Sequence, residues 1–255
     1  MIPLFEYLWL LPLGFAAGVI GSMIGLGGGF LIVPVLTFFG FSPTLAASDS
    51  LFAAFSNSVA STISYAKQKR IVYSLGVKLA LLSIPGTILG AYISEAVSPP
   101  LFKILFAGVL VGSGIYIYMR RKMESKEYNL SKQIIIFVIG ASFFAGIISS
   151  LFGIGGGVVF VPLMIIIMGL SMKLAAPTSQ FILMFASASG MIIHSLLGHP
   201  NYYEAAFLST GSFIGGMTGS RLSKHITERN LRIFVIIILA LTAVKLTIDA
   251  LGHLS

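Results

Sequence analysis

The chain has 255 residues, of which 56% are hydrophobic and 9% are charged, whereas about 25% of residues are charged in ordinary soluble domains. Apolar stretches of about 20 residues, each long enough to cross a bilayer, follow one another with few interruptions. This composition predicts an all-α polytopic membrane protein and excludes a soluble domain. The net charge of +8 comes from basic residues between the apolar segments, so it indicates membrane topology and no nucleic-acid partner. The absence of cysteine excludes disulfides and thiol chemistry.

The first apolar segment, residues 8–40, is interrupted by the glycine cluster Gly25–Gly29 (GLGGG), and Pro34 follows the cluster. As a single helix this segment would extend about 50 Å, which exceeds the hydrocarbon thickness of about 30 Å. It therefore forms either one long broken span or a hairpin that returns to its own side of the membrane. Residues 1–13 lack the basic region of a cleavable signal peptide, so we expect the segment to remain in the mature protein.

Apolar periods and polar breaks place the remaining elements. Spanning helices are expected at about residues 44–66, 74–95 and 101–120, and the polar linker 121–133 follows them. The second half begins with another interrupted apolar segment, residues 134–169. Its spanning helices are expected at about residues 173–197, 203–222 and 231–250.

The second half repeats the pattern of the first in the same order. Gly153–Gly157 (GIGGG) and Pro162 match the first glycine cluster and its proline. Further along, Gly86 and Gly90 align with Gly211 and Gly215. We infer one integral membrane domain built from two transmembrane repeats, residues 1–120 and 134–255, which a cytoplasmic linker at 121–133 joins.

The distribution of Lys and Arg decides between the two paths of the interrupted segments. If both are hairpins, every basic residue except Lys103 and Lys245 lies on the cytoplasmic side, as the positive-inside rule requires. If both are single spans, the basic groups at 67–70 and 221–232 lie on opposite sides. We therefore predict two inverted repeats, each a glycine-broken re-entrant hairpin plus three transmembrane helices. Both termini are predicted outside the cell membrane, and the loop 120–133 is predicted in the cytoplasm.

The glycine clusters indicate an anion site near the middle of the membrane. The second arm of each hairpin starts at its cluster, so the free N–H groups and positive dipole end of a short helix lie there. Glycine also lets the backbone approach a ligand closely. The alternative is that the glycines serve tight helix packing, which we expect for Gly86 and Gly90. Three adjacent glycines exceed what packing needs, and the cluster occurs twice.

Hydroxyl and amide side chains follow each hairpin near the start of the next helix. They could donate to an oxyanion, although Ser and Thr are also common caps at helix starts. The groups that we predict to bind substrate are Gly27, Gly28, Gly29, Ser48, Ser50, Asn57, Gly155, Gly156, Gly157, Thr178, Ser179 and Gln180.

Asp49 stands apart because its counterpart in the second half is Thr178. An acidic residue in or near hydrocarbon is costly, which marks it as a functional candidate. We predict that Asp49 carries a coupled proton; the alternative is a capping residue at the outer surface.

The histidines provide no metal site. His194 and His199 are five residues apart, which differs from the i, i+4 spacing of a helical metal pair, so we expect neither a metal nor a cofactor. A pH-sensing role for His194 stays open. The spans also hold no Ser–His, paired-Asp or His-Glu-x-x-His constellation, and the chain is therefore not expected to be an enzyme.

The two glycine–proline patterns, the segment Thr178–Gln180 (TSQ) and the paired GxxxG helices resemble the TauE/SafE family of sulfite and organosulfonate exporters, also described as sulfonate uptake permeases. The resemblance covers essentially the whole chain. It implies secondary transport of a small sulfur-containing oxyanion (sulfite, thiosulfate, sulfate or an organosulfonate), coupled to protons. Ser48-Asp49-Ser50 departs from the Thr-Ser expected there from the second half.

An anion-selective channel and a transporter of another small organic anion share these sequence features and remain alternatives. The partners that we expect are a small anionic substrate, protons and the lipid bilayer, with a homodimer left open. Substrate identity and the direction of transport do not follow from the sequence.

Overall fold

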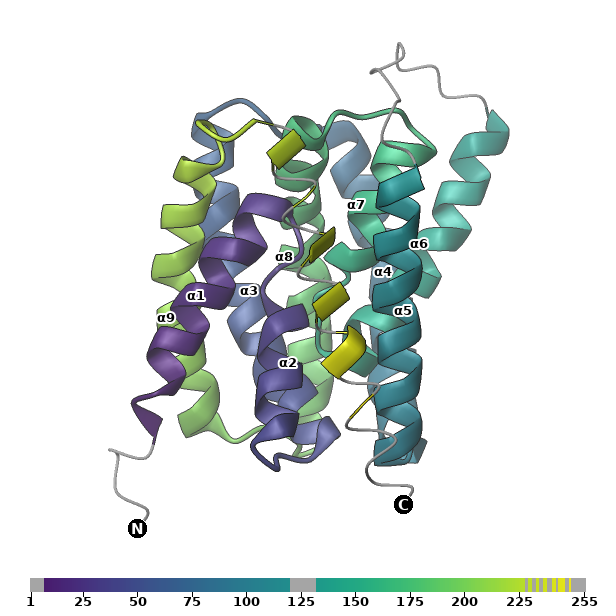
Figure 1. Ribbon diagram of the computed structural model, residues 1–255. Coiled ribbons are helices and arrows are strands. Elements are labelled where there is room, and N and C mark those ends of the chain that lie inside the picture. The colour runs from purple at the N-terminus through teal and green to yellow at the C-terminus, as the bar shows by residue number, and fades with distance from the viewer. Residues whose placement is uncertain are drawn as a thin grey trace.

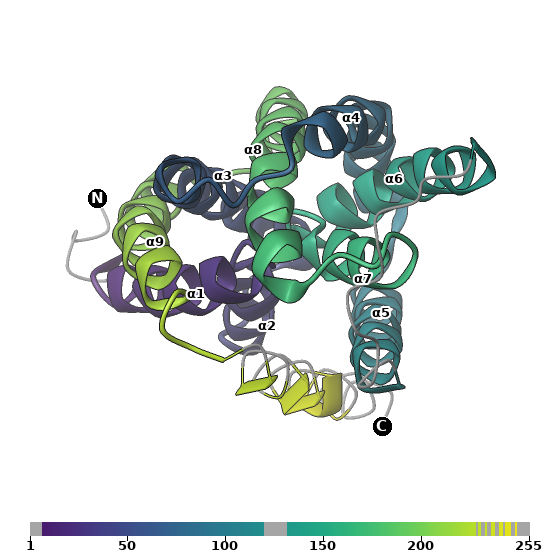
Figure 2. The same ribbon diagram turned by 90° about the horizontal axis from the view of Figure 1, so that it is seen from above.

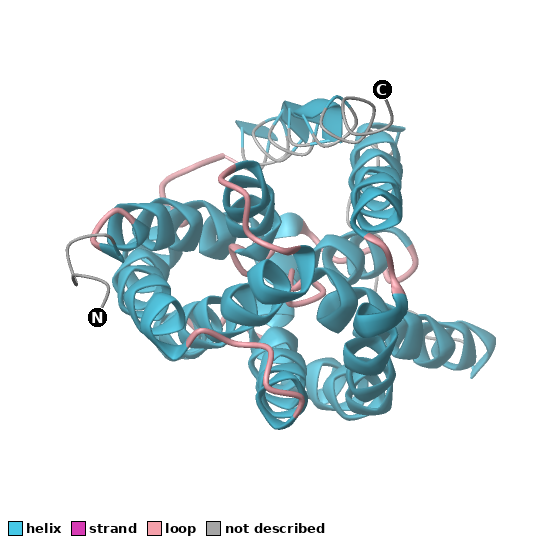
Figure 3. Cartoon of the chain, turned by 90° about the horizontal axis from the view of Figure 1, so that it is seen from below, coloured by secondary structure: helices cyan, strands magenta, loops and turns pink. Residues whose placement is uncertain are grey.

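The computed structural model describes residues 7–119 and 132–227, together with some residues between 229 and 248. This part of the chain is helical and contains no strand (Figure 3), which confirms the predicted all-α class. The predicted linker and the predicted last helix lie largely outside the described residues. The helices are α1 (Leu10–Ile24), α2 (Gly29–Phe38), α3 (Pro43–Lys67), α4 (Tyr73–Ala96), α5 (Pro99–Met119), α6 (Lys132–Phe152), α7 (Gly157–Ile166), α8 (Met172–Leu196) and α9 (Tyr202–Leu222).

Two of the described helices, α4 and α8, are long and apolar enough to cross a membrane. Helix α3 is as long as α8 but carries more polar residues, and most of those polar side chains are buried inside the bundle. A span whose polar face points into the protein can cross a bilayer at lower overall hydropathy, because the lipid meets only its other face.

Each half begins with a helical hairpin (Figure 1). Helix α1 rises from the lower end of the bundle, the chain reverses, and α2 returns to the same end. Helices α6 and α7 form a corresponding hairpin from the upper end. Both reversals use glycines with positive φ, at Gly25, Gly27 and Gly28 in the first hairpin. A side chain in this left-handed conformation costs about 1–2 kcal/mol, which explains why the turns are glycine-rich.

Helix α8 lies between α3 and α4 near the middle of the bundle (Figure 2). Its first turns provide a small surface at Ala176, against which Gly25 of the first hairpin packs. On α3, Ala47 receives Gly153 of the second hairpin in the same way. Each hairpin tip is therefore held by the long helix that follows the other hairpin.

Glycines also bring two pairs of helices into backbone contact. Helix α1 packs along α9, and α4 packs along α6. Gly86 and Gly90 of α4 meet the backbone of Phe143 and Ile147, and there is no space for a side chain at either glycine. The predicted packing role of this pair is therefore confirmed.

The prediction that Gly86 and Gly90 align with Gly211 and Gly215 of the second half is wrong by about one helical turn. In α9, the glycines that make the matching contacts with α1 are Gly215, against Phe15, and Gly219, against Val19. The alignment of Gly86 and Gly90 with Gly211 and Gly215 failed because α9 has glycines at several one-turn intervals. Any shift of four residues therefore gives a similar sequence match.

Candidate substrate and proton sites

The two glycine segments lie side by side and antiparallel at the centre of the bundle. Gly29 packs against the carbonyl oxygen of Gly153 and the backbone of Ile154, and Gly157 packs against the carbonyl oxygen of Gly25. All of these residues are buried. The helix starts of α2 and α7 thus approach each other, as the sequence predicted for an anion site, but here they face backbone rather than a free volume.

Ser50 and Ser179 fasten each hairpin to the opposite half. Ser50 Oγ donates to the Gly153 carbonyl at 2.8 Å, and Ser179 Oγ donates to the Gly25 carbonyl at 2.7 Å. Both pairs are buried, so each bond satisfies a carbonyl group that water cannot reach. In this conformation each of the two hydroxyls donates its one hydrogen to the backbone. The prediction that they donate to substrate therefore concerns a different conformation, and it remains a prediction.

The two amide side chains predicted for the site use only part of their hydrogen-bonding capacity. Gln180 Nε2 donates to the Gly21 carbonyl at 2.8 Å, while its Oε1 is buried and has no partner among the described residues. Asn57 Oδ1 accepts from Ser61 at 3.4 Å and packs against Gly216, while its Nδ2 is buried and has no partner in the same part of the chain. Both side chains therefore keep one unused polar group inside the bundle.

Several buried donors have no hydrogen-bond partner within the described residues. They belong to Ser48, Asn57 and Thr62 of α3 and to Ser142, Ser149 and Ser150 of α6. Ser149 and Ser150 were not among the residues predicted from the sequence. Their signal was a pair of hydroxyls in an otherwise apolar run just before the second glycine cluster. Ser149 lies directly beside Gly156, at the start of α7.

Leu183 packs against the middle of both glycine segments. Its side chain is fully buried and lies against both Gly27 and Gly155. Ala54 of α3 also lies beside Gly155, so a large side chain from α8 and a small one from α3 meet at the same glycine. One leucine of α8 therefore contacts both segments just before the starts of α2 and α7.

A separate groove of about 240 Å³ lies beside α5. It is lined by Leu110, Val111, Gly114, Ile115, Ile236 and Ala240. These residues offer an anion no polar side chain, so the groove suits an acyl chain and is not the predicted site.

Asp49 is fully buried in α3 and holds the start of α9. Its Oδ1 accepts from the backbone N–H of Asn201 at 3.0 Å. In the other half, Thr178 Oγ1 accepts from the backbone N–H of Val72 at 3.0 Å, at the start of α4. Asp49 and Thr178 thus share one structural task, which a hydroxyl performs as well as a carboxylate. The carboxyl group at position 49 exceeds what that task requires.

Glu204 of α9 is a second buried acid, beside Asp49, and it was not among the residues predicted from the sequence. Its Oε1 accepts from Asn201 Nδ2 at 2.7 Å, and its carboxyl group interacts with that of Asp49. Asp49 Oδ2 and Glu204 Oε2 are both buried without a hydrogen-bond partner among the described residues. Two neighbouring buried carboxyl groups are poorly stable when both are ionised, so the pair is suited to holding a proton. At the start of a helix, Glu204 reads from sequence as an ordinary first-turn acid.

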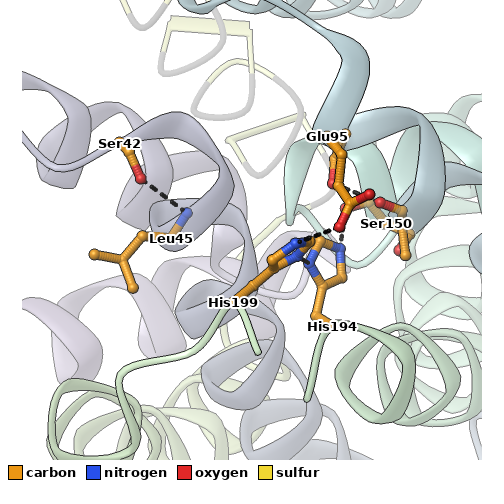
Figure 4. Close-up of polar contacts among 8 residues, drawn as sticks. Ser42, Leu45, Glu95, Ser150, His194 and His199 are labelled. Atoms are coloured by element: carbon orange, nitrogen blue, oxygen red, sulfur yellow. Dashed lines mark hydrogen bonds and ion pairs between the residues drawn. The ribbon is translucent and has the colours of Figure 1, made fainter. Parts of the chain in front are cut away.

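The histidines at the lower end form a chain of contacts (Figure 4). His194 Nε2 lies 3.2 Å from the Ser150 carbonyl oxygen, and its Nδ1 lies 2.8 Å from His199 Nδ1. His199 Nε2 then lies 3.1 Å from Glu95 Oε1. Among the described residues no group of His, Cys, Asp or Glu is arranged to hold a metal ion.

Arg70, at the upper end of the bundle, makes several contacts through its guanidinium group. Its Nε donates to the Lys173 carbonyl at 3.0 Å, its Nη1 donates to Ser223 Oγ at 3.0 Å, and it lies over the ring of Tyr65. Burial lowers the pKa of the guanidinium, although arginine stays charged at any physiological pH. Besides its predicted role in topology, Arg70 therefore ties together α3, α8 and the end of α9.

Comparison with known proteins places this architecture in a group. The family model for sulfite exporter TauE/SafE matches residues 10–246. Probable membrane transporter protein YunE of Bacillus subtilis is 28% identical, over 96% of this chain and 99% of the relative. A probable membrane transporter protein of Methanocaldococcus jannaschii is 29% identical over 91% and 93% of the two chains. Probable membrane transporter protein YfcA of Escherichia coli is 22% identical over 93% and 88%. No solved structure matches.

A helical bundle with apolar spans, a buried polar interior and relatives of this kind defines a membrane transporter. The match over nearly the whole length shows which one: the chain belongs to the sulfite exporter TauE/SafE family. The resemblance drawn from the glycine–proline patterns is confirmed.

Proposed function

We propose that this protein is a secondary transporter of a small sulfur-containing oxyanion, such as sulfite, thiosulfate, sulfate or an organosulfonate, and that it is driven by protons. The substrate class is suggested by the family description, sulfite exporter. The structure supports it through two glycine-led helix starts at the centre of the bundle, because helix N-termini favour anions without needing a buried cation.

The hairpins are proposed to be re-entrant and the halves to be inverted repeats. The path of the chain in Figure 1 supports this, because α1–α2 and α6–α7 enter from opposite ends of the bundle. Matching contacts in the two halves, such as those of Ser50 and Ser179, also support it. With the basic residues in the cytoplasm, the end at which α1 begins faces outside.

Substrate entry requires the two glycine segments to separate. In this conformation the two segments touch through their backbones, Leu183 packs against both, and Ser50 and Ser179 hold the opposing carbonyls. Movement of one hairpin away from its serine would free that hydroxyl together with the unpartnered groups of Ser48 and Ser149. Alternating access then follows if the hairpins release one at a time toward opposite faces.

The proton is proposed to bind at Asp49, with Glu204 as the second carboxyl group of the pair. Both acids hold Asn201, so a change in their charge acts directly on the loop before α9. A carboxylate that is protonated when it enters hydrocarbon avoids the cost of burying its charge.

The observation that carries the proposal is the pairing of the two helix starts around Leu183. The test is uptake into proteoliposomes of sulfite, thiosulfate, sulfate, an alkyl sulfonate and acetate, with and without a pH gradient. Saturable uptake of a sulfur oxyanion that a gradient accelerates is expected. Preference for acetate would favour another organic anion, and a flux that neither saturates nor responds to the pH gradient would favour an anion channel.

A further inference from the structure

The His194–His199–Glu95 chain contains more hydrogen-bond positions than neutral histidines can fill. The Ser150 carbonyl can only accept, so His194 Nε2 must carry a hydrogen. The two Nδ1 atoms, 2.8 Å apart, need one hydrogen between them, and the contact of His199 Nε2 with Glu95 needs a third. Two neutral imidazoles supply two hydrogens. The arrangement therefore holds one proton beyond neutral histidines and an ionised glutamate.

The surplus proton is needed because a neutral His199 has one ring hydrogen for two contacts. The neutral ring can donate from Nε2 to Glu95 or from Nδ1 to His194 Nδ1, but it cannot do both. Both contacts form together when His199 carries a second hydrogen. Glu95 is half exposed and the His199 side chain is 12% exposed, whereas His194 is fully buried. The proton is thus exchangeable with solution at the lower end of the bundle.

We propose that His199 and Glu95 form a proton-binding site that latches the α8–α9 loop, residues 197–201, to the end of α4. The form in which His199 keeps both of its contacts is the protonated form, so it is favoured at low pH and lost as the pH rises. Among the side chains, histidine is the usual proton-binding group near neutral pH. The ligand of this site is the proton itself.

The other half of the protein shows that the structural task alone does not call for a histidine. Tyr65 of α3 occupies the corresponding place and donates from its hydroxyl to the Ser22 carbonyl at 2.8 Å. Its second contact is with Ser223 Oγ at 3.1 Å, and a phenol does not titrate between pH 5 and 8. The tyrosine end therefore holds its contacts at any such pH, and the histidine end does not.

The latch also acts on the acids of the same loop. Two residues after His199, Asn201 binds Asp49 from α3 and Glu204 from α9. The charged and titratable groups that meet the loop among the described residues are thus His194, Glu95, Asp49 and Glu204. Loss of the surplus proton would leave His199 with one of its two contacts and so loosen the segment that holds the carboxyl pair.

The test uses the natural absence of cysteine. A nitroxide spin label on Leu197→Cys reports the mobility of the loop in detergent, and a second on Tyr203→Cys reports the start of α9. Each label is expected to be immobile near pH 5 and mobile near pH 8. If one proton controls the loop, the ratio of the immobile to the mobile component of the spectrum should change about tenfold per pH unit. His199→Gln and Glu95→Gln should each abolish this transition.

Tyr65→Phe serves as the matched control, because it removes the corresponding carbonyl contact at the other end. It should lower the melting temperature by a similar amount at every pH and leave the transition intact. Melting curves of all variants establish that they are folded. No transition in the otherwise unmodified protein, or the same transition in folded His199→Gln, would overturn the latch. The spectra require no substrate, so the outcome does not depend on which anion is transported.

Discussion

The backbone N–H of Asn201 donates to Asp49 Oδ1 at 3.0 Å, which fixes the start of α9 to a buried acid of α3. The side chain of the same asparagine holds Glu204 at 2.7 Å. One loop residue therefore contacts both acids. At the proposed proton site, a change in the protonation of either acid would alter the contacts that hold the start of α9.

Asp49→Asn should preserve folding and anion binding but abolish acceleration of uptake by a pH gradient. The asparagine oxygen can still accept from the Asn201 N–H, whereas the amide cannot gain or lose a proton. Uptake with and without a gradient in proteoliposomes measures the effect. A variant that responds to the gradient as before would reduce Asp49 to a capping residue.

Thr178→Val provides the matched control for that experiment. It removes the acceptor for the Val72 N–H, the contact that corresponds to Asp49–Asn201, and should destabilise the protein by about 0.5–1.5 kcal/mol because a partly buried N–H loses its partner. Its response to the pH gradient should be unchanged. Loss of coupling in this variant as well would show that any damage to these loops mimics the loss of a proton site.

Ser50→Ala and Ser179→Ala should each destabilise the occluded state by about 1–3 kcal/mol, since each leaves a buried glycine carbonyl without its donor. Because the two serines hold different hairpins, we expect the variants to shift access toward opposite faces. Labelling of single cysteines near each end of the bundle measures this shift. Identical labelling patterns in the two variants would contradict independent release of the hairpins.

Leu183→Ala should open space beside the two glycine segments, at Gly27 and Gly155. The melting temperature should fall, in line with the 2–5 kcal/mol typical of such truncations, and the apparent affinity for the anion should rise severalfold because the occluded state is weakened. Ile182→Ala, also fully buried on α8, is the control for lost packing alone. Equal substrate titrations of both variants would place the anion away from Leu183.

Gly28→Ala and Gly156→Ala should weaken anion binding and also destabilise the fold by about 1–2 kcal/mol, because both positions have positive φ. Gly90→Ala should reduce stability through its clash with the backbone of Ile147 and leave the affinity of the surviving folded protein unchanged. Melting curves and substrate titrations separate the two effects. Normal affinity in both cluster variants would mean that their glycines serve packing.

Impermeant labelling of single cysteines should place the N-terminus outside and a residue within 120–132 inside, as the charge distribution predicts. The natural protein without cysteine provides the unlabelled background. Reaction of the two termini from opposite sides would exclude the hairpin topology.

The helix positions were predictable because each begins or ends at a strong local signal. Predicted boundaries near 44–66, 74–95 and 173–197 lie within two residues of α3, α4 and α8. Apolar length and polar breaks provide this information without knowledge of neighbours. The glycine register of α9 was not predictable in the same way, because several registers give equivalent sequence matches and the correct one depends on contact with α1.

The candidate site was predictable in its residues but not in its partners. Asp49 was visible as an acid in an apolar chain, whereas Glu204 resembles an ordinary acid at a helix start. Their relationship arises through Asn201, which lies far from Asp49 in sequence. The spacing of His194 and His199 excluded a helical metal pair, yet the turn after α8 brings their rings into contact. Sequence periodicity carries no information on such folded-back loops.

The packing of α1 on α9 and of α4 on α6 has a further consequence for how the polypeptide is assembled. Each pair joins one helix from the first half with one from the second, and the backbones of the two helices touch at the glycines. Separating the halves would remove these packing contacts and expose both helix surfaces to lipid. The two halves are interlocked rather than placed side by side. A gene split between them would therefore yield two fragments that are each degraded when made alone and protected when made together.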